Sequence, residues 1–270
     1  MEPSKHQEFE GNTLSWNLLD GVIELSLHHP PANEMGRAML DEAEHFVVWL
    51  ESHSTEARVL IVYSQLKSGF SAGGDLREMY THLQHSVQSM VDIRSSLERS
   101  HRVLNTIDAS PLTTIAAVQG ICFGGGLELA LTCDIIIADE MARFCFPELR
   151  LGLIPGGGGI PRLRRDTRNG FIRDLLLTGR SINSARAVSA GLVSQQAAEG
   201  EALNLARSAA AQINKLDSAA RIAAKRLIKP IPYDDLRREM DIFCELFSKP
   251  AVMAGLRRFV ESTDLFPHLP

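Results

Sequence analysis

The sequence has few of the residues that would mark a metal-binding, redox or secreted protein. It contains only four cysteines among 270 residues: Cys122, Cys133, Cys145 and Cys244. No two of them form a C-x-x-C pair, so the pattern predicts neither a metal site nor a redox motif. Three of them lie in apolar runs and are interpreted as small core residues. Free thiols of this kind fit a reducing compartment.

Long apolar runs, an excess of basic residues and targeting signals are also missing. No uncharged apolar run reaches roughly 18 residues, so we expect no membrane-spanning segment. The first ten residues have neither the apolar stretch of a signal peptide nor the Arg-rich bias of a transit peptide. The net charge of −5 gives no general attraction to nucleic acid or to an anionic membrane. We therefore expect a cytoplasmic protein without nucleic-acid or membrane partners.

The apolar residues, 44% of the chain, are arranged in short runs that alternate with helical patterns. Strands are predicted at 21–28, 58–63, 114–118 and 134–138. Helices are predicted at 37–52, with Asn33 as the cap, in a mixed helical region at 76–108, and at 125–132. Further helices are predicted at 160–177, 184–189, 200–215, 217–228, 233–247 and 250–262. This order of elements predicts an α/β fold with a helical last third.

Several glycine-rich segments match nucleotide or hydrolase motifs only superficially. Gly124–Gly126 lacks the G-x-G-x-x-G spacing, and Gly156–Gly159 is not followed by Lys and Ser or Thr, so neither predicts a phosphate site. Gly69–Gly73 is a literal G-x-S-x-G match. Five residues separate it from the preceding strand, however, and the later histidines do not fit the order of a hydrolase triad.

Two glutamates stand out because each is framed by glycines and apolar residues. Glu128 follows Gly124–Gly126, and Glu148 precedes Gly156–Gly159. Paired carboxylates can hold a water molecule and share acid and base roles. A lone Glu on a helix is more often on a solvated face, but Glu rarely sits unpaired among apolar neighbours. The pair is therefore a candidate catalytic site.

The glycine turns can supply a second component, an oxyanion hole. Small residues at Ser71–Gly74 let a ligand oxygen approach the backbone closely. Gly124–Gly126 precedes a helix whose dipole favours negative charge. Two amides that converge on one carbonyl oxygen would form an oxyanion hole, although ordinary tight turns would give the same local pattern.

Together, these motifs and their order resemble the enoyl-CoA hydratase/isomerase (crotonase) superfamily over about residues 20–260. The resemblance rests on the segments 70–76, 117–130, 133–138, 146–156, 176–182 and 187–193. It implies a spiral of repeated β-β-α units over residues 1–198. It also implies a C-terminal helical region over 199–270 that mediates trimerisation and covers an acyl-CoA pocket. Relatives form trimers that often pair into hexamers.

The resemblance also implies roles for individual residues. The amides of Ala72 and Gly125 would hold the thioester carbonyl of an acyl-CoA. Glu128 and Glu148 would position and activate water, with help from an amide near Gly156. The implied substrate and CoA contacts are Ala32, Lys67, Ala72, Gly73, Gly74, Asp75, Leu76 and Phe259. No metal and no cofactor are expected, because acyl-CoA is the substrate.

The sequence departs from the family where CoA would bind. Only His28 and His29 could supply charge in the loop that matches the CoA-binding loop of relatives, and the basic residue that often follows the position of Phe259 is missing. An acyl carrier protein thioester is therefore an alternative substrate. Asp75 is expected to cap a helix, and Glu78 to form a surface ion pair.

Five arginines cluster in the predicted helix at 160–177: Arg162, Arg164, Arg165, Arg168 and Arg173. We interpret them as a solvated or subunit-interface face. A carrier protein or the CoA phosphates are the alternative partners for this cluster.

The main functional hypothesis is an enoyl-CoA hydratase, which adds water reversibly to a 2-enoyl thioester. The alternative is isomerisation or dehydration of a specialised CoA or carrier-protein thioester. A more remote alternative is a non-catalytic RNA-binding or scaffold protein. The net acidity and the acidic side chains of helix 37–52 argue against RNA binding.

Overall fold

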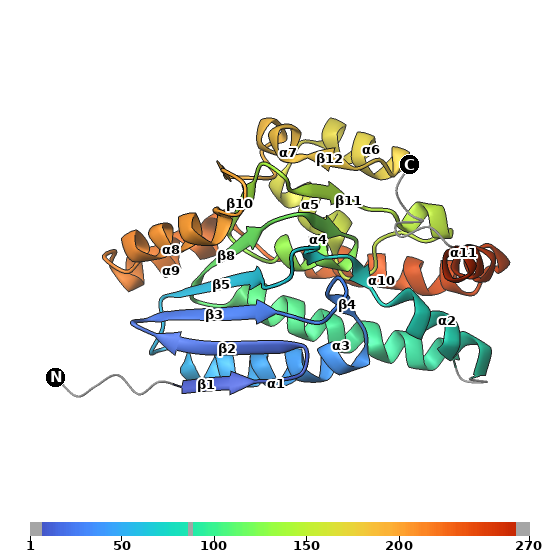
Figure 1. Cartoon of the computed structure of the whole chain (residues 1–270), viewed down its shortest axis with the longest axis horizontal. Coiled ribbons are helices and arrows are strands. Elements are labelled where there is room, and N and C mark those ends of the chain that lie inside the picture. Colours follow the sequence, from blue (N-terminus) through green and yellow to red (C-terminus); the bar gives the residue numbers. More distant parts are fainter. Residues whose placement is uncertain (1–6, 86–88, 263–270) are drawn as a thin grey trace.

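The computed structural model describes residues 7–85 and 89–262 and is built around a large mixed sheet (Figure 1). Within the described residues, this sheet has seven strands in the spatial order β1-β2-β3-β5-β8-β10-β13. The first three strands pair antiparallel, and the later neighbours pair parallel. Their bounds are β1 (Gln7–Glu10), β2 (Leu14–Leu19), β3 (Val22–Leu27), β5 (Val59–Ser64), β8 (Thr113–Val118), β10 (Ile135–Asp139) and β13 (Gln195–Ala197).

Short strands form a second sheet beside the first. Their spatial order is β12-β11-β9-β6, and a further pair joins β4 to β7. Strands β5, β8 and β10 are each followed in the chain by a short strand, β6, β9 or β11. This repetition confirms the predicted spiral of β-β-α units. The bounds are β4 (Glu34–Met35), β6 (Gly69–Ser71), β7 (Gly73–Gly74), β9 (Ile121–Phe123), β11 (Arg143–Cys145) and β12 (Ile182–Asn183).

Helices connect the strands and cover the sheet. The connecting helices are α1 (Arg37–His53), α2 (Leu76–His85), α3 (Ser89–Ala109), α4 (Gly125–Ala130), the 3-10 turn η1 (Glu148–Leu151), α5 (Gly159–Asp166), α6 (Asn169–Thr178) and α7 (Ser184–Ala190). The chain closes with α8 (Ala202–Ile213), α9 (Ser218–Ile228), α10 (Tyr233–Phe247) and α11 (Pro250–Glu261). No helix in the described part of the chain is apolar and long enough to span a membrane.

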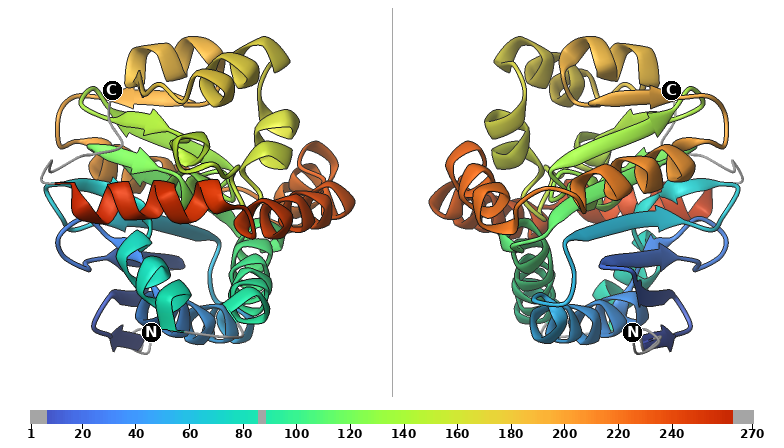
Figure 2. Two further views of the ribbon diagram at one scale, coloured as in Figure 1. Left: turned by 90° about the vertical axis from the view of Figure 1, so that its right-hand side faces the viewer. Right: turned by 90° about the vertical axis from the view of Figure 1, so that its left-hand side faces the viewer.

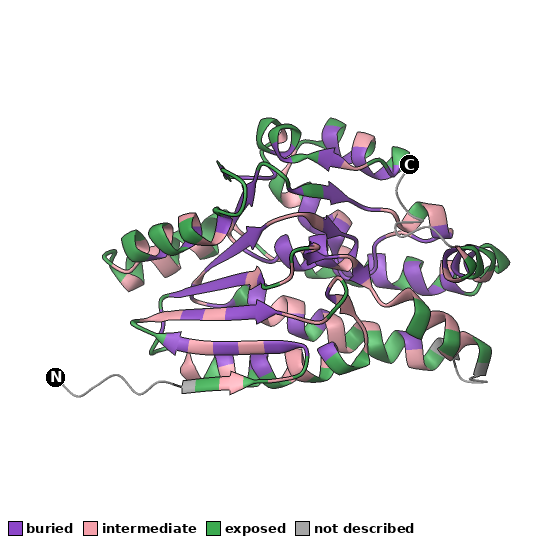
Figure 3. Cartoon of the chain, viewed as in Figure 1, coloured by how far each residue is buried: buried purple, intermediate pink, exposed green. Residues whose placement is uncertain are grey.

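The central strands of the sheet are buried (Figure 3), and their side chains point alternately to its two faces. Successive side chains of a strand point to opposite faces. Leu60 and Val62 of β5 pack toward α1 and α3, whereas Val59 and Ile61 pack against α8. The two views of Figure 2 show helices on both sides of the sheet. The central strands are therefore buried on both faces, as their continuous apolar runs predict.

Three local predictions differ from the structure. The predicted helix at 160–177 is two helices, because Thr167 and Arg168 adopt extended backbone between α5 and α6. Asn33 does not cap α1, whose N-cap is Gly36. The Asn33 side chain instead donates to Ser64 Oγ and to the Phe70 carbonyl oxygen. The hairpin of β1 and β2 was not predicted, although Leu14, Trp16 and Leu18 alternate clearly.

Candidate active site

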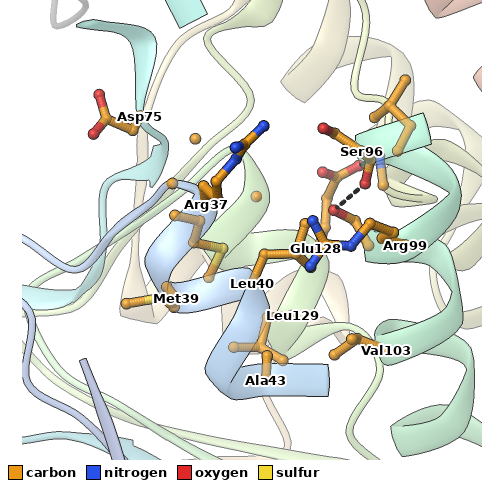
Figure 4. Close-up of a pocket in the computed structure, with 18 of the residues that line it drawn as sticks. Arg37, Met39, Leu40, Ala43, Asp75, Ser96, Arg99, Val103, Glu128 and Leu129 are labelled. Atoms are coloured by element: carbon orange, nitrogen blue, oxygen red, sulfur yellow. Dashed lines mark hydrogen bonds between the residues drawn. The ribbon is translucent and has the colours of Figure 1, made fainter. Parts of the chain in front are cut away.

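A cavity of about 320 Å³ lies beside the glycine turns, between α1, α3 and α4 (Figure 4). Glu128 and Glu148 both line it. The glycines of its lining are Gly36, Gly74, Gly125, Gly156 and Gly157. The structure therefore brings the two predicted glutamates to one cavity, together with three of the predicted glycines: Gly74, Gly125 and Gly156.

Glu128 lies in the first turn of α4 and is held rigidly by backbone amides. Its Oε1 accepts hydrogen bonds from the N–H groups of Gly157 (2.7 Å) and Gly159 (2.9 Å). The pKa of Glu128 is raised above its usual value because the side chain is buried, although the two amide bonds and the charge of Arg162 act in the opposite direction. One carboxylate oxygen is therefore fixed, and the other remains for a ligand or water.

Glu148 begins the 3-10 turn η1, directly after Pro147. The residue is partly exposed, but its Oε2 is buried and has no hydrogen-bond partner. Burial raises the pKa of this carboxyl well above its usual range, and the charge of Glu128 raises it further. A buried carboxyl without a partner favours the protonated form, so Glu148 is the better proton donor of the pair.

Gly124 makes room for Glu148. Its φ of 47° is in the left-handed region, and a Cβ there would lie 2.7 Å from Glu148 Oε1. Any larger residue would clash with the carboxylate and strain the turn. The first glycine of the 124–126 cluster therefore leaves the space that the Glu148 carboxyl occupies.

Buried polar side chains hold the loop at 156–160. His101 Nε2 donates to the Gly156 carbonyl oxygen at 2.7 Å, and burial lowers the pKa of this imidazole. Arg162 donates to the carbonyl oxygen of Gly157 and to Asp108 Oδ2, each at 2.8 Å. Because the carbonyl groups are fixed, the amide groups of the same loop point at Glu128.

The position of Arg162 corrects a prediction. We expected it on a solvated or interface face, but its side chain is fully buried, as is that of its ion-pair partner Asp108. Arg165 is also nearly buried and pairs with Asp108, whereas Arg164 is exposed. Only part of the basic cluster is therefore on the surface, because α5 turns one of its faces into the core.

A further buried carboxylate near the site, Glu239 of α10, was not predicted. Its Oε1 accepts a hydrogen bond from the Ile160 N–H at 2.8 Å, and its buried Oε2 has no partner. Burial raises its pKa well above the usual range, and the charge of Glu128 adds to the effect. The sequence carries a signal for it, because Glu239 falls in the apolar stripe of Leu236, Met240 and Phe243.

The predicted oxyanion donor Ala72 is wrong in this structure. Its N–H donates to the Ala32 carbonyl oxygen at 2.8 Å, and Ala72 does not line the cavity. Gly74 and Gly125 do line it, and a Cβ built on Gly125 would lie 3.6 Å from the Gly74 nitrogen. The backbone at Gly74, two residues later in the same loop, is therefore the one that lies beside Gly125 at the cavity.

Some of the other predicted substrate contacts line the cavity, and the rest lie outside it. Asp75 and Leu76 line the cavity, and Asp75 also caps α2 by accepting from the N–H groups of Arg77 and Glu78. Glu78 lines the cavity as well and accepts from the Arg37 N–H. The residues outside the lining are Ala32, Lys67, Gly73 and Phe259.

Two of these residues outside the lining, Lys67 and Phe259, differ in their exposure to solvent. Lys67 is exposed. Phe259 is only 9% exposed and packs within its own chain, with the Arg77 guanidinium carbon 5.5 Å from its ring centroid. The ring therefore packs against α2, and its contact with CoA stays a prediction.

Comparison with known proteins identifies relatives of this architecture. Residues 18–266 match the family model described as enoyl-CoA hydratase/isomerase. The chain is 32% identical over 257 residues to the probable enoyl-CoA hydratase of Bacillus subtilis, covering 93% of this chain and 96% of that protein. It is 34% identical to the probable enoyl-CoA hydratase 2, mitochondrial, of Arabidopsis thaliana, covering 77% of this chain and 67% of that protein. A putative enoyl-CoA hydratase from Streptomyces avermitilis has the same fold, with a TM-score of 0.83 at 24% identity, covering 97% and 94% of the two chains.

Proposed function

Because the chain belongs to the enoyl-CoA hydratase/isomerase family, we propose that it adds water reversibly to a 2-enoyl-CoA thioester. The observation that carries the proposal is the pair of glutamates at one cavity in different hydrogen-bonding states. Glu128 is fixed by two amides, and Glu148 has a buried oxygen without a partner. Titratable groups whose environments differ in this way can divide the base and acid roles.

In the proposed mechanism, the Glu128 carboxylate is the base. It takes a proton from a water molecule, whose oxygen adds to C3 of the enoyl group. Protonated Glu148 gives a proton to C2, so water is added across the double bond, and at the end Glu128 holds one proton more and Glu148 one proton fewer. Solvent exchange then restores the starting protonation states. Burial raises the pKa of both carboxyls. At Glu128 the two amide bonds and the charge of Arg162 oppose this effect, whereas at Glu148 the charge of Glu128 adds to it, so Glu128 is the more readily ionised of the two.

The proposed oxyanion donors are the amides of Gly74 and Gly125. Negative charge builds on the thioester oxygen when water adds to C3, and amides placed at that oxygen stabilise the resulting enolate. Gly125 lies in the first turn of α4, where the helix dipole adds to this stabilisation. Loss of one such donor typically costs about 2.7–4 kcal/mol in the barrier.

We further propose that Ala32 and Lys67 contact CoA outside the cavity, and that the protein assembles as trimers or pairs of trimers. Both proposals rest on the family resemblance. The Ala32 carbonyl oxygen has a second lone pair beyond its bond to Ala72, so it can still accept a hydrogen bond. An acyl carrier protein thioester remains the alternative substrate.

The function is tested by following the ultraviolet absorbance of trans-2-butenoyl-CoA with the wild type and with Glu148→Gln. We expect turnover by the wild type and a fall in kcat of about 10²-fold or more in the variant, the usual scale for an acid–base group. Glu245→Gln is the control, because Glu245 is an exposed glutamate on α10. Wild-type activity that survives Glu148→Gln unchanged would contradict the assignment.

Double-bond isomerisation is the second candidate. A carboxylate and a neutral carboxyl at one cavity can also move a proton between two carbon atoms. Product analysis by mass spectrometry separates the two reactions, because hydration adds the mass of water and isomerisation leaves the mass unchanged.

A further inference from the structure

The cavity continues beyond the glutamates into a gap between α1 and α3, which we call the α1–α3 channel. Its walls are Leu40 and Ala43 of α1 and Ser96, Ser100 and Leu104 of α3. Figure 4 shows Leu40 and Ala43 on one side, Val103 on the other, and Glu128 and Leu129 between the two helices. The channel is therefore continuous with the candidate active site.

The inner end of the channel is apolar and closed. It is formed by Leu14, Leu25 and Leu27 of the sheet, Phe46 of α1 and Ile107 of α3. All of these side chains are at most 3% exposed. A polar group placed there would lose its hydrogen bonds to water without replacement. The nucleotide part of a thioester substrate therefore cannot enter this end, but a hydrocarbon chain can.

The outer rim of the channel is charged. Arg99 of α3 lines the cavity and pairs with Asp41 and Glu44 of α1, so an ionic tie joins the two helices there. Arg37 and Glu78 line the cavity near the start of α1. The charged groups lie at the surface and the apolar groups inside, which orients a ligand with its hydrocarbon tail inward.

The small side chains of the walls leave space that larger residues would fill. Ala43, Ser96 and Ser100 face the gap from both helices. We propose that the α1–α3 channel binds the hydrocarbon tail of a medium-length or longer, unbranched 2-enoyl thioester. This proposal rests on the proposed function, because it places the reacting end of the same substrate at Glu128 and Glu148.

The test compares trans-2-butenoyl-CoA with trans-2-decenoyl-CoA in the wild type and in two pairs of variants. Ala43→Phe and Ser100→Phe fill the channel from opposite walls, because both residues are partly buried and line the cavity. Val48→Phe and Ser95→Phe are matched controls, because these residues are exposed on the same helices and do not line the cavity. Far-UV circular dichroism checks that each variant is folded.

For the wild type we expect kcat/KM to rise by about three- to fourfold for each added CH2 that is buried. Each channel-filling variant should lower kcat/KM for decenoyl-CoA by at least about tenfold, the worth of two buried CH2 groups. The value for butenoyl-CoA should change little, and the controls should match the wild type for both substrates. Equal losses for both substrates, or no loss for decenoyl-CoA in either variant, would overturn the proposal.

Calorimetric binding of the saturated butanoyl-CoA and decanoyl-CoA separates this inference from the proposed function. A preference for decanoyl-CoA that both channel-filling variants abolish would support the channel even if the wild type hydrated neither enoyl substrate. Hydration of butenoyl-CoA without any preference for the longer chain in binding would uphold the function and reject the channel.

Discussion

At the scale of single residues, the site depends on buried carboxylates with unequal hydrogen bonding. Glu128 accepts two amide bonds, Glu239 accepts one from Ile160, and the Oε2 atoms of Glu148 and Glu239 accept none. Arg162 is the buried cation nearest to this group, and it is already paired with Asp108. The protein therefore carries more buried carboxyl groups here than cations to neutralise them.

This excess of buried carboxyl groups over buried cations predicts a pH-dependent effect of Glu239→Gln on stability. The pKa of Glu239 is raised in the folded state, so this carboxyl ionises more readily in the unfolded chain, and its stability contribution is lost as pH rises above the unfolded value. The amide of Gln keeps an acceptor for the Ile160 N–H and cannot ionise. We expect the variant to have a higher Tm than the wild type at pH 8, by roughly 2–4 °C for each kcal/mol gained.

At pH 4 the two proteins should melt together, because Glu239 is then neutral in the folded state. Differential scanning calorimetry at both pH values measures this difference. The exposed Glu245→Gln serves as control on the same helix and should show no such dependence. A Tm that falls equally at both pH values would mean that Glu239 acts only through packing.

At the scale of elements, the glycine loop at 156–160 is held in place by side chains from three helices. His101 comes from α3, Arg162 from α5 and Glu239 from α10. Because these donors and acceptors satisfy the loop backbone, the amides that hold Glu128 are placed before substrate binds. The orientation of the Glu128 carboxylate, the proposed base, is therefore set by elements that are far apart in the sequence.

Replacing Arg162 should break this arrangement. Arg162→Met removes the bond to the Gly157 carbonyl oxygen and takes one cation from buried Asp108. Asp108 keeps its ion pairs with Arg165 and Lys229, so the expected cost is that of a lost hydrogen bond to a charged group, about 1.5–3 kcal/mol. Urea denaturation should show a loss of this size, and kcat should fall in the protein that remains folded. Arg164→Met, at an exposed position, should leave both unchanged, and equal stability losses in the two variants would contradict the role of Arg162.

The elements around the site differ in how well the sequence alone predicts them. The strands at 59–64 and 113–118 were predicted, at 58–63 and 114–118, because they are continuous apolar runs, which a buried parallel strand requires. Arg162 was misplaced because a run of arginines hides which member faces inward. Ala72 was preferred to Gly74 because the choice depends on which backbone N–H is already used within the fold, and residue types do not record this.

At the scale of the whole molecule, the C-terminal helices close over the turn that carries Glu148. Gly255 of α11 packs directly on η1, and a Cβ there would lie 2.9 Å from both Cα and the carbonyl oxygen of Leu151. Phe243 of α10 lines the cavity, and a Cβ on Gly156 would lie 2.6 Å from its ring. Residues near the end of the described chain therefore contact a site whose proposed catalytic residues, Glu128 and Glu148, come from its middle.

This closure predicts that Gly255→Ala will lower kcat although Gly255 touches no substrate. Alanine favours a helix more than glycine, so local propensity alone would stabilise α11. The added methyl group cannot fit against the Leu151 backbone, and overpacking of this kind costs about 1–3 kcal/mol. The helix or η1 must shift, and Glu148 shifts with η1.

Gly170→Ala in α6 is the matched control, because a Cβ there meets no atom within 4 Å. Steady-state kinetics and thermal melts of the two variants should show opposite signs for stability and a loss of kcat only for Gly255→Ala. Unchanged kcat in that variant would mean that α11 covers the site without positioning Glu148.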